Sequence, residues 1–150
     1  VWVMGSAYNH IASEIAQREN KQFDVEDLAA GMVKFANGAT LIIEASWAAN
    51  IKERELMETR LLGTKAGLIQ HNTNEGYSFE AELYYERNGC QFDMRLHPPV
   101  PAVKSSMYHF VESIVNNSPH LATGEEGLVV MELLDAIYAS AAQGTPIEIK

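Results

Sequence analysis

Two Asn-Gly pairs, each set between runs of alternating apolar and polar residues, most constrain what this chain can fold into. Asn37-Gly38 separates residues 28–35 from residues 40–47, and Asn88-Gly89 separates residues 78–86 from residues 91–97. An Asn-Gly pair readily adopts the positive φ angles of a two-residue hairpin turn. Each pair therefore predicts a β-hairpin with antiparallel strands.

The alternation gives the predicted strands one apolar face each, because successive side chains of a strand point to opposite sides. In residues 40–47 the apolar face holds Leu41, Ile43, Ala45 and Trp47, and the opposite face holds Ile42, Glu44 and Ser46. In the second hairpin the apolar face holds Phe79, Ala81, Leu83, Tyr85, Phe92, Met94 and Leu96. Further strands are expected at residues 1–7, 56–62, 68–69 and 146–149, with a turn at residues 63–67.

Apolar residues recur with a helical period in the last third of the chain. Met107, Phe110, Val111, Ile114 and Val115 form one stripe after a serine cap at Ser105 or Ser106. A second helix is expected to begin at Thr123, because Glu126 three residues later completes a capping box, and to end at Gly144 before Pro146. Its stripe continues through Leu134, Ile137, Tyr138 and Ala141.

Hairpins followed by two amphipathic helices predict the α+β class. We expect an open, predominantly antiparallel β-sheet with helices packed on one face. A chain of 150 residues fits one compact domain, so residues 1–150 are expected to form a single domain.

Charge and cysteine content narrow the setting in which the chain works. The formal net charge is -9, from 20 acidic and 11 basic residues, and no run of Lys or Arg forms a patch for phosphates, so no nucleic acid partner is expected. Cys90 is the only cysteine, which favours the cytoplasm. No apolar stretch is long enough to span a membrane, and no signal peptide is evident. The chain begins at Val1 without an initiator methionine, as though it were part of a longer protein.

Complete catalytic motifs are not found. No G-x-G-x-x-G turn occurs, and residues 63–67 lack its spacing and its helix, so we expect no nicotinamide cofactor on this chain alone. His10, His71, His97, His109 and His120 are scattered, which argues against a zinc site, and no metal site is predicted.

Two clusters of polar residues invite a catalytic or metal-binding interpretation. Asp93 and His97 would be neighbours on a helix, but on the predicted strand their Cα atoms are ~13 Å apart, so a solvated sheet face is favoured. Asp24, Glu26 and Asp27 are better explained as a solvated loop with helix-capping or turn roles than as a cation site. No catalytic residue is therefore assigned on this chain.

Several motifs together resemble the C-terminal domain of the Gfo/Idh/MocA oxidoreductases. They are D-V-E-D-L-A at residues 24–29, V-K-F-A-N-G-A-T-L at 33–41, E-A-S-W-A-A-N-I at 44–51, L-G-T-K-A-G at 62–67, H-F-V-E-S-I at 109–114, T-G-E-E-G-L at 123–128 and G-T-P-I-E at 144–148. Their order and spacing cover nearly the whole chain. Between residues 70 and 104 only the strand pattern matches.

The resemblance implies a two-domain enzyme that acts on sugars, cyclitols or related small hydroxy or carbonyl compounds. An N-terminal Rossmann domain would hold NAD or NADP, and the family's Lys-Pro element and its Asp-and-His helix lie upstream of Val1 in the usual order. This domain would cover the substrate and build a homo-oligomer, and it would be inactive alone.

Trp47 and Asn50 are the residues best placed to bind the substrate, through an apolar ring face and an amide. Trp47 is alternatively a core residue, since it shares the apolar face with Leu41 and Ile43. Ile42 and Tyr84 interrupt the polar face of the sheet, which suggests self-association through that face. Two other functions stay open, namely a non-catalytic binding or assembly module and a stand-alone enzyme that uses Asp93 and His97.

Overall fold

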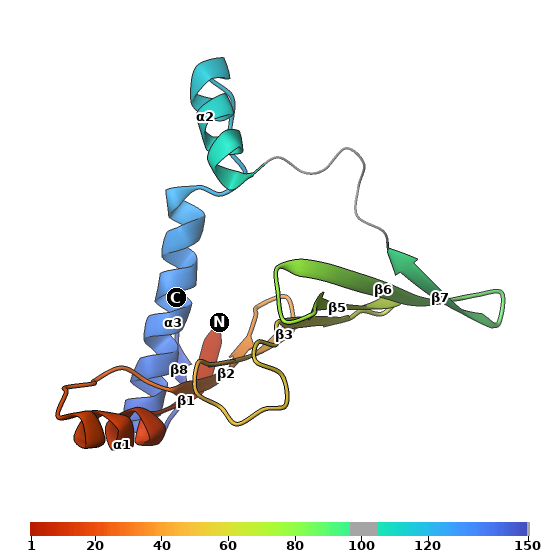
Figure 1. The fold of residues 1–150 in the computed structure, drawn as a ribbon. Coiled ribbons are helices and arrows are strands. Elements are labelled where there is room, and N and C mark those ends of the chain that lie inside the picture. The colour runs from red at the N-terminus through yellow and green to blue at the C-terminus, as the bar shows by residue number, and fades with distance from the viewer. Residues whose placement is uncertain (97–104, 150) are drawn as a thin grey trace. The chain divides into compact units, whose positions relative to one another are not determined.

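The computed structural model describes residues 1–96 and 105–149 (Figure 1). These residues divide into two compact units, one made of residues 1–50 and 119–150 and the other of residues 51–118. We call them the first and the second unit and describe each by itself.

The first unit contains a four-stranded antiparallel sheet, which we call sheet A. Its strands are β1 (Trp2–Tyr8), β2 (Leu28–Lys34), β3 (Thr40–Ser46) and β8 (Ile147–Glu148), in the order β3-β2-β1-β8. The turn between β2 and β3 contains Gly38 at a φ of 90°. The predicted hairpin is confirmed, but its turn is not the expected two-residue turn, because the connection runs from residue 35 to residue 39 and Asn37 does not have a positive φ.

Helix α3 (Gly124–Gln143) packs on one face of sheet A, over β1 and β2. The core of the unit is formed by Val3, Val33, Ala136 and Ile137. The approach is close because glycines face the helix: a Cβ atom added at Gly5 would lie 2.7 Å from Ile137 Cγ2, and one added at Gly31 would lie 2.8 Å from Ile137 Cδ1.

The C-terminal end of the chain completes the edge of sheet A beside β1. Strand β8 pairs with Trp2 and Val3 only. Before β8, at the end of α3, the hydroxyl of Ser140 accepts a hydrogen bond of 3.0 Å from the amide of Gly5 and donates one of 2.8 Å to the carbonyl of Thr145. The amide of Ile149 donates to the carbonyl of Val1 over 2.8 Å. The first and last described residues of the chain are therefore neighbours.

The second unit contains another four-stranded antiparallel sheet, which we call sheet B. Its strands β4 (Glu58–Leu62), β5 (Ala66–Thr73), β6 (Ser78–Arg87) and β7 (Cys90–Leu96) follow one another in chain order. Leu83 of β6 lies opposite Leu68 and Met94, and the rings of Tyr85 and Phe92 stack with centroids 5.2 Å apart. The predicted apolar face of this hairpin is confirmed. Helix α2 (Ser106–Asn116) also belongs to this unit.

The predicted α+β class and antiparallel strands are confirmed, and so are the caps at Ser105, Thr123 and Gly144. The strands are shared between two sheets, which turn signals could not reveal because a turn fixes only the two strands that it joins. The stripe of α2 that was expected to face a core leaves Met107, Val111, Ile114 and Val115 exposed.

Helix α1 (His10–Glu19) has no clear signal in the sequence. Its apolar positions include Ile11, Ala12, Ile15 and Ala16, of which Ala12 and Ala16 are buried. Two of these four residues are alanines, so the stripe has little hydrophobic contrast with its surroundings.

Candidate functional site

The candidate site lies at one end of sheet A, where three strands reach the same level. Tyr8 of β1 pairs with Leu28 of β2, and Leu28 pairs with Ser46, the last residue of β3. Residues 47–50 follow directly, and they include both predicted substrate-binding residues, Trp47 and Asn50. We call residues 47–50 the substrate segment.

The hydroxyl of Ser46 fixes the course of the backbone in the substrate segment. It accepts hydrogen bonds from the amides of Ala48 and Ala49, at 3.2 and 2.9 Å, and donates one of 2.5 Å to the carbonyl of Asp27. A serine side chain that bonds the next backbone amides is a common way to stabilise a turn. The turn after β3 is thus tied both to itself and to the segment before β2.

Trp47 is 56% exposed, so it is not a core residue of the first unit, and the core interpretation is wrong. The strand has ended at Ser46, which is why the alternation of β3 no longer governs the ring. The indole Nε1 donates a hydrogen bond of 2.8 Å to the carbonyl of Glu26, and the ring of Phe23 lies beside the indole with centroids 5.3 Å apart. One edge of the indole is therefore fixed while much of its surface meets solvent.

Asp27 holds this end of the sheet together. It is buried, its carboxylate Oδ2 accepts a hydrogen bond of 2.9 Å from the amide of Ala12, and its own amide donates to the carbonyl of Tyr8 over 2.8 Å. Ala12 belongs to the first turn of α1, where backbone amides lack helical partners and favour a negative charge. The predicted helix-capping role is confirmed for Asp27, although its side chain is buried rather than solvated.

Glu26 connects the site to α3. Its carboxylate Oε1 accepts a hydrogen bond of 2.7 Å from the hydroxyl of Tyr138. This bond lowers the pKa of Glu26 from its ordinary value of 4.5 and raises the pKa of Tyr138 from its ordinary value of 10.0. Near neutral pH Glu26 is ionised and Tyr138 is protonated, so neither group is poised to exchange protons there.

The groups gathered here are suited to binding. Two partly exposed aromatic rings, the amide of Asn50 and the carboxylate of Glu26 can offer an apolar surface with polar groups beside it. The arrangement can contact and orient a small polar molecule that has an apolar face.

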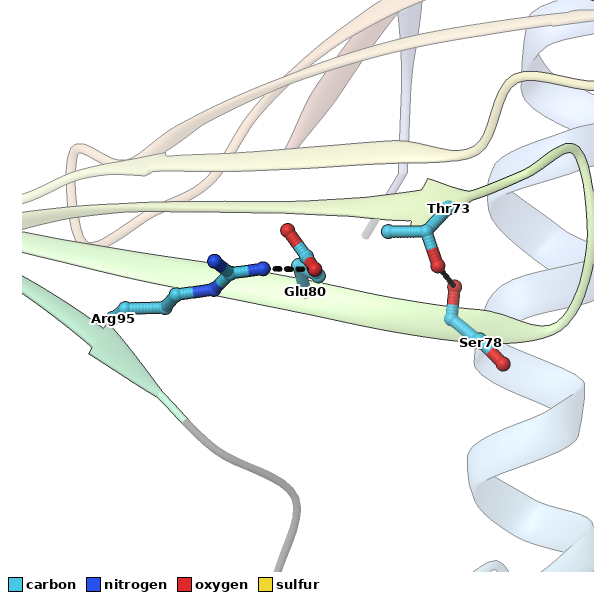
Figure 2. A network of polar contacts seen from close by, with 4 residues as sticks. All are labelled: Thr73, Ser78, Glu80 and Arg95. Carbon is cyan, nitrogen blue, oxygen red and sulfur yellow. Dashed lines mark hydrogen bonds and ion pairs between the residues drawn. The ribbon is translucent and has the colours of Figure 1, made fainter.

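The polar face of sheet B carries the other residues that the sequence singled out. Arg95 of β7 forms an ion pair with Glu80 of β6, and the hydroxyl of Thr73 donates a hydrogen bond to the carbonyl of Ser78, as Figure 2 shows. The Glu80 and Arg95 side chains are well exposed, and pairs of this kind contribute at most ~1 kcal/mol to stability. This network therefore marks a solvated sheet surface.

Asp93 lies on β7 opposite Tyr84, which donates a hydrogen bond to Glu82. The Glu82 hydrogen bond is the main reason that the pKa of Tyr84 is raised. His97, the other half of the proposed acid/base pair, lies outside the described residues. Across residues 1–96 and 105–149, no three His, Cys, Asp or Glu side chains are grouped to hold a metal ion.

The glycine-containing turn at residues 63–67 joins β4 to β5, and the amide of Gly63 donates to the carbonyl of Ala66 over 3.0 Å. A pyrophosphate site needs a turn between a strand and a helix, with free amides at the helix N-terminus. A hairpin turn whose amide is already bonded does not fit a dinucleotide. In the part of the chain that the structure describes, no helix is long and apolar enough to cross a membrane.

Phe23 and Tyr138 belong to the site although sequence reasoning did not place them there. From the sequence, Tyr138 fits the apolar stripe of α3, and Glu26 fits a loop or a cation-binding cluster. Glu26 and Tyr138 are 112 residues apart, so no local pattern could connect them.

Comparison with known proteins gives a consistent family. Residues 2–149 match the oxidoreductase family, C-terminal alpha/beta domain, of the Gfo/Idh/MocA proteins. A D-glucoside 3-dehydrogenase of Escherichia coli strain K12 is 30% identical over 129 residues, which are 85% of this chain and 34% of that protein. The chain thus spans about a third of the length of this relative.

Solved structures show the same fold at low identity. An aldose-aldose oxidoreductase from Caulobacter crescentus, complexed with glycerol, superposes with a TM-score of 0.71 at 19% identity over 99% of this chain and 41% of that one. An oxidoreductase from Agrobacterium radiobacter, in complex with NAD+, L-tartaric acid and magnesium, gives a TM-score of 0.61 at 17% identity over 98% of this chain and 42% of that one. With its match over residues 2–149, this chain belongs to the Gfo/Idh/MocA oxidoreductase family, as a C-terminal α/β domain.

Proposed function

We propose that this chain is the substrate-side and oligomerisation domain of an NAD- or NADP-dependent oxidoreductase that acts on a sugar, a cyclitol or a related small hydroxy or carbonyl compound. The observation that carries the proposal is the family match over residues 2–149. The chain works in the cytoplasm, in keeping with its single cysteine. It is inactive alone, because an N-terminal Rossmann domain supplies the cofactor and the groups that move protons.

The substrate class follows from the relatives. The D-glucoside 3-dehydrogenase and the aldose-aldose oxidoreductase are named for carbohydrate substrates, and the Agrobacterium radiobacter oxidoreductase was crystallised with NAD+. In this chain the same class of substrate suits the site, because a pyranose or cyclitol ring combines an apolar face with hydroxyls at its rim. An indole can pack on the apolar face of such a ring, and a side-chain amide can form hydrogen bonds with its hydroxyls.

Trp47 and Asn50 are the substrate-binding residues of this proposal. Both are exposed, and they lie in the substrate segment that Ser46 holds in place. Hydride would pass between the substrate carbon and nicotinamide on the N-terminal domain. This chain binds and orients the substrate, and no proton transfer is assigned to its residues.

The face of sheet A that points away from Ile137 is the proposed oligomer surface. Met32 of β2 lies between Met4 of β1 and Ile42 of β3 in the register. Ile42 is 77% exposed, Met4 and Met32 are each 37% exposed, and the Met4 sulfur also accepts a hydrogen bond of 3.5 Å from the Ser140 hydroxyl of α3. We call these three residues the open face. Apolar residues aligned across three strands are typical of a protein interface. Tyr84, the other residue proposed for such a face, is hydrogen bonded to Glu82 on sheet B.

Kinetics of the complete protein that carries this domain test the proposal. It is titrated with NAD+ and NADP+, and their reduced forms, against a panel of aldoses, glucosides and inositols. We expect reduction or oxidation of one nicotinamide with a subset of the panel. Trp47→Ala and Asn50→Ala are expected to raise KM by about tenfold, since ~1.4 kcal/mol of binding corresponds to a factor of ten. Gln143→Ala, at an exposed position of α3, serves as the control and should keep the parental KM.

No response to any nicotinamide would contradict the redox function. Oligomerisation or sugar binding without turnover would then favour the alternative of a binding or assembly module with the same fold. Turnover that Trp47→Ala and Asn50→Ala leave unchanged would keep the oxidoreductase and exclude the substrate segment.

A further inference from the structure

Phe23 is the residue near the substrate segment whose position the proposed function does not use. It lies in the connection from α1 to β2 and is 41% exposed. Within residues 1–96 and 105–149, the aromatic ring beside Phe23 is that of Trp47, with centroids 5.3 Å apart and planes inclined by 44°. Other phenylalanines of this chain are exposed to a similar extent, so it is the position of Phe23 beside Trp47 that marks it out.

The two rings are inclined rather than stacked, and this leaves surface of both open. A stacked pair would cover one face of each ring, as Tyr85 and Phe92 do on sheet B at an inclination of 14°. Phe23 and Trp47 instead form two adjoining walls, and both side chains remain more than a third exposed. Two inclined aromatic surfaces can contact a ring-shaped ligand on two sides.

The Trp47 wall is held in position by hydrogen bonds that the ligand does not have to create, and the connection that carries Phe23 is anchored at its end. Trp47 Nε1 donates a hydrogen bond to the carbonyl of Glu26, and the Glu26 carboxylate accepts one from the hydroxyl of Tyr138 on α3. Phe23 lies three residues before Glu26 on the same connection, and Asp27 anchors the end of that connection to β1 and α1. A surface that is already ordered loses little conformational entropy on binding.

We propose that Phe23 is a second substrate-contacting residue, which forms with Trp47 a two-walled aromatic platform for the apolar face of a pyranose or cyclitol ring. The proposal rests on the proposed function and deepens it, because it adds a contact that selects among ring substrates. A cyclic substrate can touch both walls, whereas a short open-chain polyol has no ring face to offer. The polar groups available near the two rings are the amide of Asn50 and the carboxylate of Glu26.

The test uses the complete protein and compares Phe23→Ala, Phe23→Leu and Phe23→Tyr with Trp47→Ala. We expect Phe23→Ala to raise KM for the preferred cyclic substrate by about five- to tenfold with kcat nearly unchanged, since the lost contact is uniform binding. Phe23→Leu should recover little, because it restores apolar volume but no ring, and Phe23→Tyr should restore the parental KM. Glycerol, which has no ring, serves as the comparison probe and should show the same weak KM in every Phe23 variant.

A double mutant separates a contact from a support. If Phe23 touches the substrate, Phe23→Ala still raises KM in the Trp47→Ala background. If Phe23 only supports the position of the Trp47 indole, Phe23→Ala does not raise KM further in the Trp47→Ala background, and the proposal is overturned. Parental KM in Phe23→Ala, with a raised KM in Trp47→Ala, would also overturn it while leaving the proposed function intact. If the parental protein shows no nicotinamide-dependent turnover with any substrate, both the proposed function and the role of Phe23 are contradicted.

Discussion

The hydroxyl of Tyr138 donates a 2.7 Å hydrogen bond to the carboxylate of Glu26, whose own backbone carbonyl accepts the indole N–H of Trp47. A residue of the last helix thereby controls the segment before β2, and that segment fixes the edge of the indole. Tyr138 and Glu26 touch no reacting atoms in our proposal and act as positioning residues for Trp47.

Removal of the Tyr138 hydroxyl should loosen the Trp47 ring without unfolding the domain. In the complete protein, Tyr138→Phe is expected to raise KM for the sugar by about two- to fivefold and to leave kcat close to the parental value. In a Trp2→Phe background, where Trp47 is the only tryptophan of this chain, its fluorescence anisotropy should fall. Tyr77→Phe removes a hydroxyl from a highly exposed tyrosine and is the matched control. Equal anisotropy in the two variants would contradict the positioning role.

The same hydrogen bond predicts a pH dependence of stability with two limbs. The pKa of Glu26 is lowered, so its contribution is present above the ordinary value of 4.5 and is lost as pH falls through the folded-state pKa. The pKa of Tyr138 is raised, so its contribution is present below 10.0 and is lost as pH rises through the folded-state pKa. The difference in Tm between the parental chain and Tyr138→Phe should therefore be constant from about pH 5 to pH 9 and shrink outside that range.

Thermal unfolding followed by circular dichroism measures this profile. In Glu26→Gln the acidic limb should disappear, because the amide does not titrate, while an alkaline limb remains. The comparison is then between Glu26→Gln and the double variant Glu26→Gln, Tyr138→Phe. If the difference in Tm between these two proteins still shrinks below pH 4.5, the acidic limb belongs to another carboxylate.

The contact of Gly5 and Gly31 with α3 predicts that alanine is not tolerated at either position. Overpacking of a close contact typically costs about 1–3 kcal/mol. Gly31→Ala and Gly5→Ala should both lower Tm, by about 2–4 °C per kcal/mol for a chain of this size. Gly127→Ala is the control, since nothing lies within 4 Å of the added Cβ and alanine favours the helix, so Tm should rise slightly.

Trimming Ile137 should rescue one of these variants and not the other. At Gly31 the closest atom is the side-chain Cδ1 of Ile137, which Ile137→Val removes, so the double variant should be more stable than the two single costs predict. At Gly5 the added Cβ also meets the Ile137 backbone oxygen at 2.8 Å, which no substitution of the side chain can move. Full rescue of Gly5→Ala by Ile137→Val would show that the helix approaches less closely than described.

The proposed oligomer surface makes a prediction about solution size. Ile42→Glu places a charge in the middle of the open face, and an unpaired charge in a protein interface is strongly unfavourable. The complete protein should shift to a smaller species in size-exclusion chromatography with light scattering. Gln17→Glu adds the same charge at an exposed position of α1 and should leave the size unchanged. An unchanged size in Ile42→Glu would exclude the open face as the interface.

The sequence predicted what local interactions decide. Asn88-Gly89 forms a hairpin turn with positive φ at both residues, and Gly38 supplies the positive φ of the other hairpin. Thr123 and Glu126 specify a helix start through reciprocal hydrogen bonds within one turn. The division into two sheets depends on which strands pair across long connections, and no turn residue carries that information. Helix α1 escaped detection because Ala12 and Ala16 supply its buried positions and contribute little hydrophobic contrast.

The site shows the same division. Trp47 and Asn50 can be proposed from the sequence because they directly follow a predicted strand end. Phe23, Glu26 and Tyr138 could not be assembled, since their meeting depends on the packing of α3 against sheet A and not on spacing in the sequence. Tyr138 even fits the apolar stripe of its helix, and only its neighbour across the fold assigns its hydroxyl to Glu26.

The bond between the Ile149 amide and the Val1 carbonyl has a practical consequence for rearranging the polypeptide. Because residues 1 and 149 meet on the same sheet edge, a short peptide can join them in a rearranged form of this domain, and the chain can be opened at the exposed turn around Gly38. Such a circularly permuted domain should keep sheet A intact. A protein fused before residue 1 and a protein fused after residue 149 would both be attached to the first unit at this sheet edge.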